Sequence, residues 1–175
     1  MEPTFEKVRI PLVAVAAVAA LVGSAAHAAG AVEVRFVEPE HYADAGIGKL
    51  ELGRTTSDFE QHLHQWAARL PPGQTLKIDV LDIDLAGTER PYRDGRPLRV
   101  LRGGADWPRV KLHYVLEEGG RTLKSGDEVL ADLDYLRRVP VPSVLEGHAY
   151  EHEFRMLDRW FDSRILGGTA GAAAG

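Results

Sequence analysis

The chain has 175 residues, a formal net charge of −5 at pH 7 and no cysteine. The lack of cysteine excludes a disulfide framework, a lipidated N-terminal cysteine and cysteine-ligated zinc or iron–sulfur sites. The mildly acidic balance provides no general attraction for nucleic acid or anionic lipid, so neither is an expected partner.

The first 28 residues have the three-part pattern of a cleavable secretory signal peptide. Lys7 and Arg9 precede an apolar run at 10–22, and the small residues that follow end in Ala26-His27-Ala28, which fits the A-x-A cleavage rule. The apolar run is shorter than the roughly 20 residues of a membrane-spanning helix, which argues against an uncleaved anchor. We therefore expect export to the periplasm, cleavage before Ala29, and no membrane span afterwards.

The remaining chain has the size of one domain with its own core, and we expect that domain to occupy residues 29–166. Residues 167–175 are almost entirely glycine and alanine. Such a tail buries too little apolar surface to offset the entropy of ordering it, so we expect disorder there.

The first elements follow from periodicity and stop signals. Residues 32–37 alternate in polarity and predict a strand, whereas the glycine-rich stretch 41–54 predicts a loop. Ser57-Asp58-Phe59-Glu60 fits a capping box, and Pro71-Pro72-Gly73 is a stop signal, so a helix is expected over 57–70. Its apolar stripe consists of Phe59, Leu63, Trp66 and Leu70.

The middle of the chain predicts strands. Residues 76–85 form an apolar strand whose phase changes near Val80–Asp82, which indicates a β-bulge. A loop is expected over 87–97 and a short strand over 98–101. Residues 109–117 give the clearest alternation and are followed by a hairpin turn at Glu118-Gly119-Gly120-Arg121.

The return strand is expected over 122–135, with a bulge at 125–127 and one inward face made of Val129, Ala131, Leu133 and Tyr135. A second helix is expected over 148–166, with the apolar stripe Tyr150, Phe154, Leu157, Phe161 and Ile165. This order predicts an α+β fold: a mixed or mainly antiparallel sheet of four to five strands with two amphipathic helices packed on one face.

Four strings, in this order and spacing, resemble an exported Gram-negative family catalogued as domain of unknown function 3016. They are VRFVEPE at 34–40, DVLDIDLAG at 79–87, RVLRGGADWPR at 99–109 and MLDRWF at 156–161. The resemblance extends from about residue 32 to residue 162. It implies an exported single domain and carries over no catalytic or binding residue.

His148-Ala149-Tyr150-Glu151-His152 matches the H-x-x-E-H pattern of inverted zinc proteases. On a helical wheel both histidines lie about 160° from the centre of the apolar stripe, and Arg155 and Arg159 continue the same face. A solvated helix face explains the pattern better than a zinc site, because cations stand where zinc needs anionic ligands. No cofactor is therefore expected, and a metal-dependent hydrolase remains the alternative function.

The same alternative has a second possible source. Asp82 and Asp84 share one strand face, as do Asp132 and Asp134. If these strands are neighbours, the four carboxylates could gather around Ca²⁺ or Mg²⁺ or act as an acid/base pair. Ordinary outward faces of alternating strands explain them without any function, and this is the favoured interpretation.

The densest basic stretch consists of Arg90, Arg93, Arg96, Arg99 and Arg102. Guanidinium groups bind carboxylate or phosphate bidentately, and loops often carry recognition residues. We therefore expect a non-catalytic binding or accessory protein of the cell envelope, with this stretch as the contact for an anionic partner such as an envelope protein or a cell-wall component. A merely solvated loop is the simpler interpretation. The sequence does not specify the oligomeric state.

Overall fold

The computed structural model describes residues 29–91, 97–137 and 148–168; the expected signal peptide and most of the expected tail lie outside these ranges. In chain order the elements are β1 (Ala31–Phe36), η1 (Pro39–His41), α1 (Gly48–His64), η2 (Gln65–Arg69), β2 (Gln74–Asp84), β3 (Thr88–Pro91), β4 (Pro97–Val100), β5 (Arg109–Glu118), β6 (Arg121–Ala131), α2 (Glu151–Trp160), η3 (Phe161–Ile165) and η4 (Leu166–Gly168). The η elements are short 3-10 or π-helical segments.

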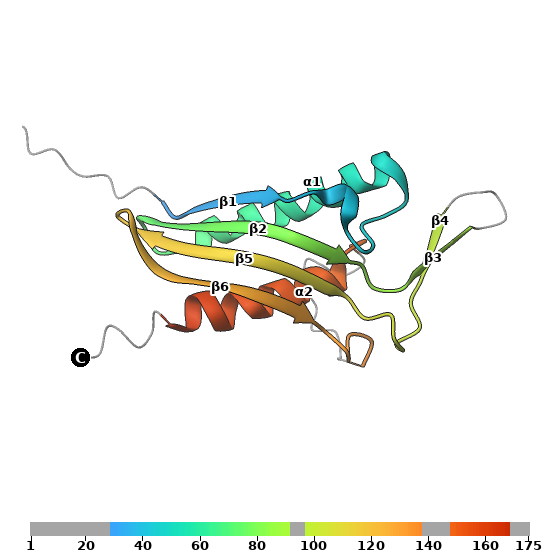
Figure 1. Ribbon diagram of the computed structural model, residues 1–175. Coiled ribbons are helices and arrows are strands. Elements are labelled where there is room, and N and C mark those ends of the chain that lie inside the picture. The colour runs from blue at the N-terminus through green and yellow to red at the C-terminus, as the bar shows by residue number, and fades with distance from the viewer. Residues whose placement is uncertain (1–28, 92–96, 138–147, 169–175) are drawn as a thin grey trace, which may run out of the picture.

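Four strands form one sheet in the order β1-β2-β5-β6, and the predicted α+β fold is confirmed. Strand β1 is parallel to β2, whereas β5 is antiparallel to both of its neighbours, β2 and β6. Both helices cover the same face of this mixed sheet, α1 beside β1 and α2 beside β6 (Figure 1). No helix in the described ranges is long and apolar enough to cross a membrane.

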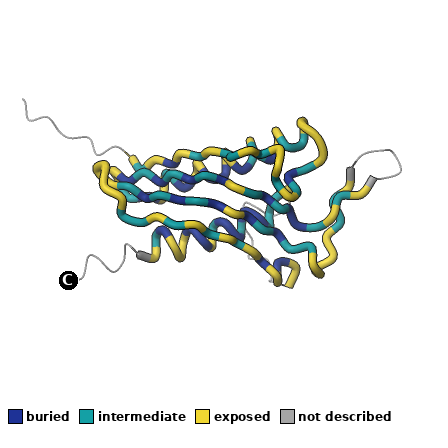
Figure 2. Tube along the Cα trace, viewed as in Figure 1, coloured by how far each residue is buried: buried dark blue, intermediate teal, exposed yellow. Residues whose placement is uncertain are grey.

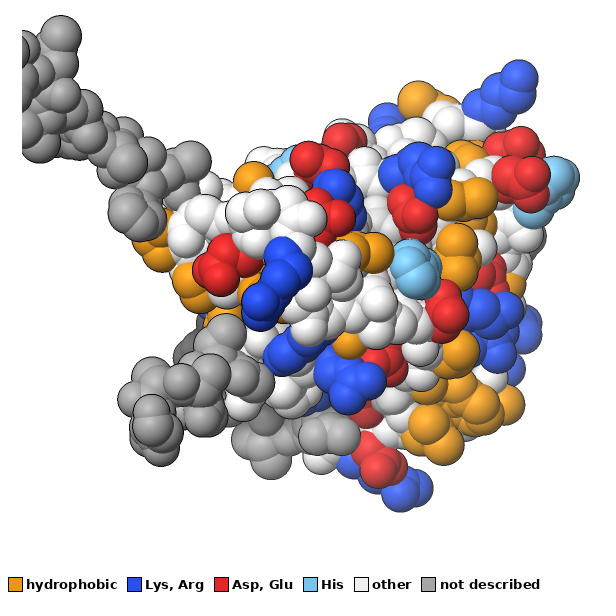
Figure 3. All heavy atoms as spheres, turned by 60° about the vertical axis from the view of Figure 1, so that its left-hand side comes forward, with side chains coloured by type: hydrophobic (Ala, Val, Ile, Leu, Met, Phe, Trp, Pro, Cys, Tyr) orange, Lys and Arg blue, Asp and Glu red, His pale blue; other side chains and the backbone are white. Residues whose placement is uncertain are grey.

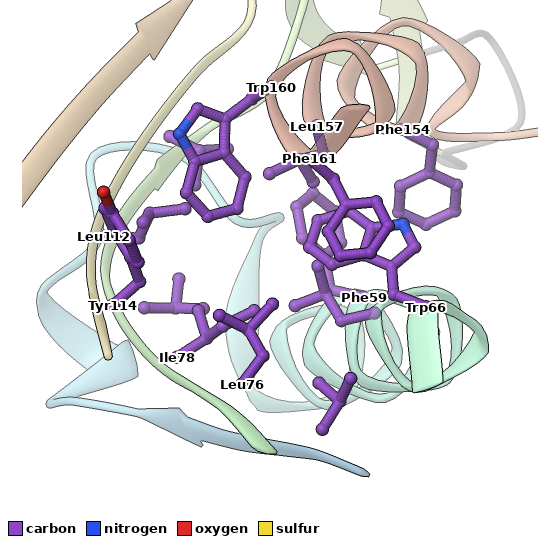
Figure 4. Close-up of a cluster of buried hydrophobic side chains, with 14 of the residues drawn as sticks. Phe59, Trp66, Leu76, Ile78, Leu112, Tyr114, Phe154, Leu157, Trp160 and Phe161 are labelled. Atoms are coloured by element: carbon purple, nitrogen blue, oxygen red, sulfur yellow. The ribbon is translucent and has the colours of Figure 1, made fainter. Parts of the chain in front are cut away.

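The core fills the space between the sheet and the two helices. Buried and more exposed positions alternate along the central strands, as expected for a sheet with one covered face (Figure 2). Trp66 stacks on Phe161 with ring centroids 4.5 Å apart, and the Trp160 ring meets Tyr114 edge-on at 5.3 Å (Figure 4). These contacts join both helices to the centre of the sheet.

The β-bulge predicted near Val80–Asp82 is confirmed, because the register between β2 and β5 shifts there. It keeps Val80 and Ile83 on the same buried face despite their odd separation. The bulge expected at 125–127 is wrong: the second shift falls at Leu116–Glu117. Gly126 pairs regularly with Tyr114.

Helix α1 begins nine residues earlier than the capping box predicts, and the loop expected over 41–54 is wrong in its second half. Gly46 and Gly48 adopt positive φ values of 98° and 80°, and they turn the chain into the helix. The Glu51 carboxylate accepts the Ile47 N–H at 2.8 Å and satisfies one free donor of the first turn. The Ser57 capping box therefore lies in the helix interior.

The inward face predicted for the last strand is mostly wrong. Val129 and Leu133 are 65% and 61% exposed, and only Tyr135 of that set is buried. Antiparallel pairing places Leu130 opposite Val110, so the even-numbered positions of β6 share the core face of β5. The strand also ends at Ala131, and a turn rather than the strand carries Tyr135 inward.

Helix α2 begins at Glu151, three residues later than predicted, and its predicted apolar stripe is confirmed. Phe154, Leu157, Phe161 and Ile165 are buried, and Tyr150 packs against their cluster.

The segment predicted as a loop before residue 98 contains a strand. β3 pairs with β4 as a two-stranded antiparallel ribbon, which we call the arm. The arm projects beyond the end of the four-stranded sheet (Figure 1).

Candidate functional site

The arginines predicted to contact an anionic partner do not share one surface. Arg93 and Arg96 lie outside the described residues. Arg90 on β3 and Arg102 after β4 are exposed. The Arg99 side chain on β4 is only 22% exposed, because it turns toward the body of the protein. Regular spacing in the sequence conceals this difference, since neighbouring positions of a ribbon alternate between its two faces.

Arg99 attaches the arm to the end of the sheet. Its Nη1 donates to Asp44 Oδ2 at 2.9 Å and its Nη2 donates to Asp44 Oδ1 at 3.0 Å, while Nη1 also reaches the Ala86 carbonyl oxygen at 3.3 Å. Asp44 exchanges backbone hydrogen bonds with Ile83 and Leu85 and so lies beside Asp84, the last residue of β2, in a parallel bridge. Burial lowers the pKa of Arg99, but hydrogen bonds and charge from Asp44 outweigh burial and raise it overall.

Glu153 is the most deeply buried carboxyl group near Arg99. It lies in the first turn of α2, is 3% exposed, and accepts the Ala86 N–H at 2.6 Å through Oε1. Burial raises the pKa of Glu153, although the hydrogen bonds from the N–H groups of Ala86 and of Glu153 itself, together with the charge of Arg99, act in the opposite direction. A buried carboxyl group with a raised pKa retains its proton to higher pH than an exposed one.

Glu89 on β3 is the cross-strand partner of Arg99. One of its oxygens is buried and has no hydrogen-bond partner among the described residues. Burial raises the pKa of Glu89, and the adjacent carboxylate of Glu51 on α1 raises it further. Two carboxylates side by side repel each other unless they share a proton, so this contact favours the protonated form. We call Asp44, Glu51, Glu89, Arg99 and Glu153 the Arg99 cluster.

The H-x-x-E-H motif does not form a helix-borne metal chelate. His148 precedes the helix, and its Nδ1 accepts the Tyr150 N–H at 3.2 Å. His152 is half-buried rather than fully solvated: its ring lies edge-on against Tyr135 at 4.8 Å, and burial lowers its pKa. Glu151 pairs with Arg155 at 2.8 Å. Within the described ranges, no three potential ligands lie close enough together to hold a metal ion.

The two aspartate rows do not meet. β5 separates β2 from β6, and Asp132 and Asp134 follow the end of β6. The two pairs of aspartates are therefore not on neighbouring strands, as a shared cation site would require. Each carboxylate has a cationic partner: Asp82 pairs with Lys111, Asp84 with Arg109, Asp132 with Arg159 and Asp134 with Arg137. Ion pairs therefore account for these acidic residues.

The face of the sheet opposite the helices is also ion-paired across strands. Arg35 pairs with Asp79 at 2.6 Å, and Lys77 pairs with Glu117 at 2.8 Å. A shallow groove of about 450 Å³ crosses this face, and its lining combines charged residues of both signs with aliphatic ones. Basic and acidic side chains intermix on the surface in Figure 3 rather than forming a field of one sign.

A family model described as "Protein of unknown function (DUF3016)" matches residues 30–163. The chain belongs to this family. A search of curated proteins and a search of solved structures gave no match. The region matched to the DUF3016 family contains the whole Arg99 cluster and the arm.

The sequence did not single out one polar contact inside this DUF3016 fold. His62 on α1 and Asp158 on α2 lie 2.9 Å apart, Nε2 to Oδ1, and the same Asp158 oxygen accepts the Trp66 Nε1–H at 2.8 Å. Burial raises the pKa of Asp158, but the hydrogen bonds from His62 and Trp66 outweigh it and lower the pKa overall. The contact links the helices. In the sequence, the spacing of His62 and Trp66 by one helical turn is the one feature that could have indicated a shared partner.

Proposed function

We propose that this DUF3016 protein is exported to the periplasm and acts as a non-catalytic binding or accessory protein of the cell envelope. Its expected partner is anionic, and the arm with the turn after β4 is the proposed contact surface. Export is supported by the signal-peptide pattern of residues 1–28. Mass spectrometry of the protein isolated from the periplasm should give a chain that begins at or near Ala29; full-length protein in the cytosol would contradict export.

One observation supports the choice of surface: the arm projects from the sheet (Figure 1), and the arm together with the turn after β4 combines exposed cations with exposed apolar side chains. Arg90 and Arg102 are exposed, and neither guanidinium has a carboxylate partner among the described residues. Leu98 and Leu101 are 47% and 40% exposed. Elsewhere in the described sheet, cations such as Lys111 and Arg109 are already paired with carboxylates.

Binding to the carboxylate-bearing peptides of the cell wall tests this surface directly. The mature protein should sediment with purified peptidoglycan, and binding should weaken as salt rises, because exposed charges are screened. Charge reversal by Arg90→Glu with Arg102→Glu should abolish sedimentation. Arg121→Glu reverses an exposed charge at the start of β6 and should leave most of the binding intact.

A protein partner is tested in intact cells with a photo-crosslinking residue at Leu98. A discrete crosslinked product that disappears in the Arg90→Glu, Arg102→Glu variant supports the proposal. A product that persists in that variant contradicts the role of these arginines. Failure of both the sedimentation and the crosslinking experiment would overturn the proposed surface.

A further inference from the structure

The arm is connected to the body by two glycine turns. Gly87 precedes β3 with φ of 84°, and Gly103 follows β4 with φ of 69°. A Cβ at Gly87 would lie 2.7 Å from the Val100 carbonyl oxygen, so the two ends of the arm approach too closely for another residue. No described arm residue belongs to the buried apolar core. Polar contacts around Arg99 therefore hold the arm in place.

Those contacts combine one central cation with an excess of carboxyl groups. Asp44 approaches Arg99 from the loop before α1, Glu89 from β3 and Glu153 from α2. Glu51 of α1 lies beside Glu89, and Asp84 at the end of β2 lies near Asp44 but pairs with Arg109 of β5. If all these carboxyl groups are ionised, two cations face five anions in a partly dry site.

We propose that the Arg99 cluster is an acid-strengthened latch, in which protonation of Glu153 and Glu89 tightens the contact of the arm with β2 and α2. Asp44 and Arg99 supply the central contact, a bidentate ion pair. Ala86, which leads into the arm, donates its N–H to Glu153, and its carbonyl oxygen accepts from Arg99 on the second strand of the arm. The Glu153 carboxyl group is therefore bonded to the residue at which the arm leaves the sheet.

The direction follows from comparing the latched arm with a displaced one. When the arm moves away, Glu89 gains water and separates from Glu51, so it binds protons less tightly. Glu153 also gains water, and it loses the nearby charge of Arg99, which favours its ionised form. Burial is the larger of these two influences on Glu153, so it too binds protons less tightly. Protons are then taken up preferentially by the latched state, and a lower pH increases its population. Burial raises the pKa of both Glu153 and Glu89 in the latched structure, which agrees with this direction.

The latch stands without any binding partner, because it concerns contacts within the chain. Its consequence for recognition rests on the proposed function: acidification would fix the orientation in which Arg90 and Leu98 are presented. The two ideas can fail separately, since the experiment below contains no partner and the sedimentation experiment does not measure arm motion.

Hydrogen exchange of the Ala86 amide measures the latch, because its N–H donates to Glu153. The full mature protein should be compared by NMR from about pH 8 to about pH 5, with exchange corrected for its intrinsic pH dependence. Protection of the Ala86 amide should rise as the pH falls. If latching raises the pKa of one titrating group by one pH unit, the protection factor should rise by at most about tenfold. Spin labels on Leu98→Cys and Val129→Cys, introduced into this cysteine-free chain, should give a narrower distance distribution at the lower pH.

The variant Glu89→Gln with Glu153→Gln keeps the acceptor for the Ala86 N–H but cannot titrate. It should show high protection and a narrow distance distribution across the whole pH range. Glu40→Gln, at an exposed position outside the cluster, should behave as wild type. Wild-type protection that does not change with pH would overturn the latch, as would an unchanged pH response in the double glutamine variant.

Discussion

The two ends of this molecule are held together by different interactions. Between the helices and the sheet, stability comes from aromatic and aliphatic packing around Trp66, Phe161 and Tyr114 (Figure 4). At the base of the arm, one arginine and several carboxyl groups replace that packing. The packed region should respond mainly to loss of volume, with Asp158 as its pH-sensitive contact, whereas the base of the arm should respond mainly to charge and pH.

Trp66→Ala tests the packed region and should have the largest effect. Trp66 is 1% exposed, stacks on Phe161 and donates a hydrogen bond to Asp158. Its truncation should lower the free energy of unfolding by about 3–5 kcal/mol, the usual range for a buried large aromatic residue. Denaturant unfolding measures the loss.

His64→Ala, at the end of α1 and two residues before Trp66 in η2, is the matched control. His64 is exposed and pairs with Glu60 across one turn, so its loss should change stability by less than about 0.5 kcal/mol. Similar losses at Trp66 and His64 would contradict the position of the helix face.

Asp158→Asn tests the polar contact between the helices and should have an intermediate effect. Asp158 accepts hydrogen bonds from both His62 and Trp66, and the change removes the charge that strengthens them. We expect a loss of about 1–3 kcal/mol, the range for disrupting a buried hydrogen-bond partner. Asp162→Asn, which loses an exposed pair with Arg69, is the control and should cost less.

The same residue predicts a pH dependence. The pKa of Asp158 is lower in the folded protein than in the unfolded chain, so its stabilising contribution is present above the unfolded pKa. That contribution is lost as the pH falls through the folded value. Unfolding of wild type and Asp158→Asn should therefore converge at acidic pH, and a constant difference would contradict this role.

Glu153→Gln tests a pH dependence opposite in direction to that of Asp158, at the base of the arm. Because burial raises its pKa in the folded state, Glu153 is destabilising when ionised, and the penalty disappears as the pH falls through the folded value. The amide keeps the contact with Ala86, so the variant should equal or exceed wild type at neutral pH, with a change below about 1 kcal/mol. A marked loss of stability at neutral pH would show that the charge is needed.

The sequence predicted the packed region better than the arm. Apolar periodicity identified the stripes that contain Trp66 and Phe154, because burial repeats with the helix or strand period. It missed the start of α1, since glycine turns and the backbone-capping carboxylate of Glu51 replaced the expected capping box. It also placed Arg99 with the exposed arginines, because the distant Asp44 partner leaves no local pattern.

The smallest expected effect lies on the ion-paired face of the sheet, where Lys111→Met removes one partner of Asp82. Their N–O distance is 3.2 Å and the Lys111 side chain is 47% exposed, so solvent already screens the pair. The change should alter stability by less than about 1 kcal/mol, and by less still at high salt.

Asp82→Ala should cost more, because Asp82 Oδ1 also accepts the Ala43 N–H at 2.8 Å and so holds the loop that carries Asp44. Salt titrations of both variants by denaturant unfolding separate the two contributions: the effect of Lys111→Met should fade with salt, whereas most of the Asp82→Ala loss should remain. If both losses faded equally, the charge of Asp82, rather than its bond to the loop, would be what stabilises this face.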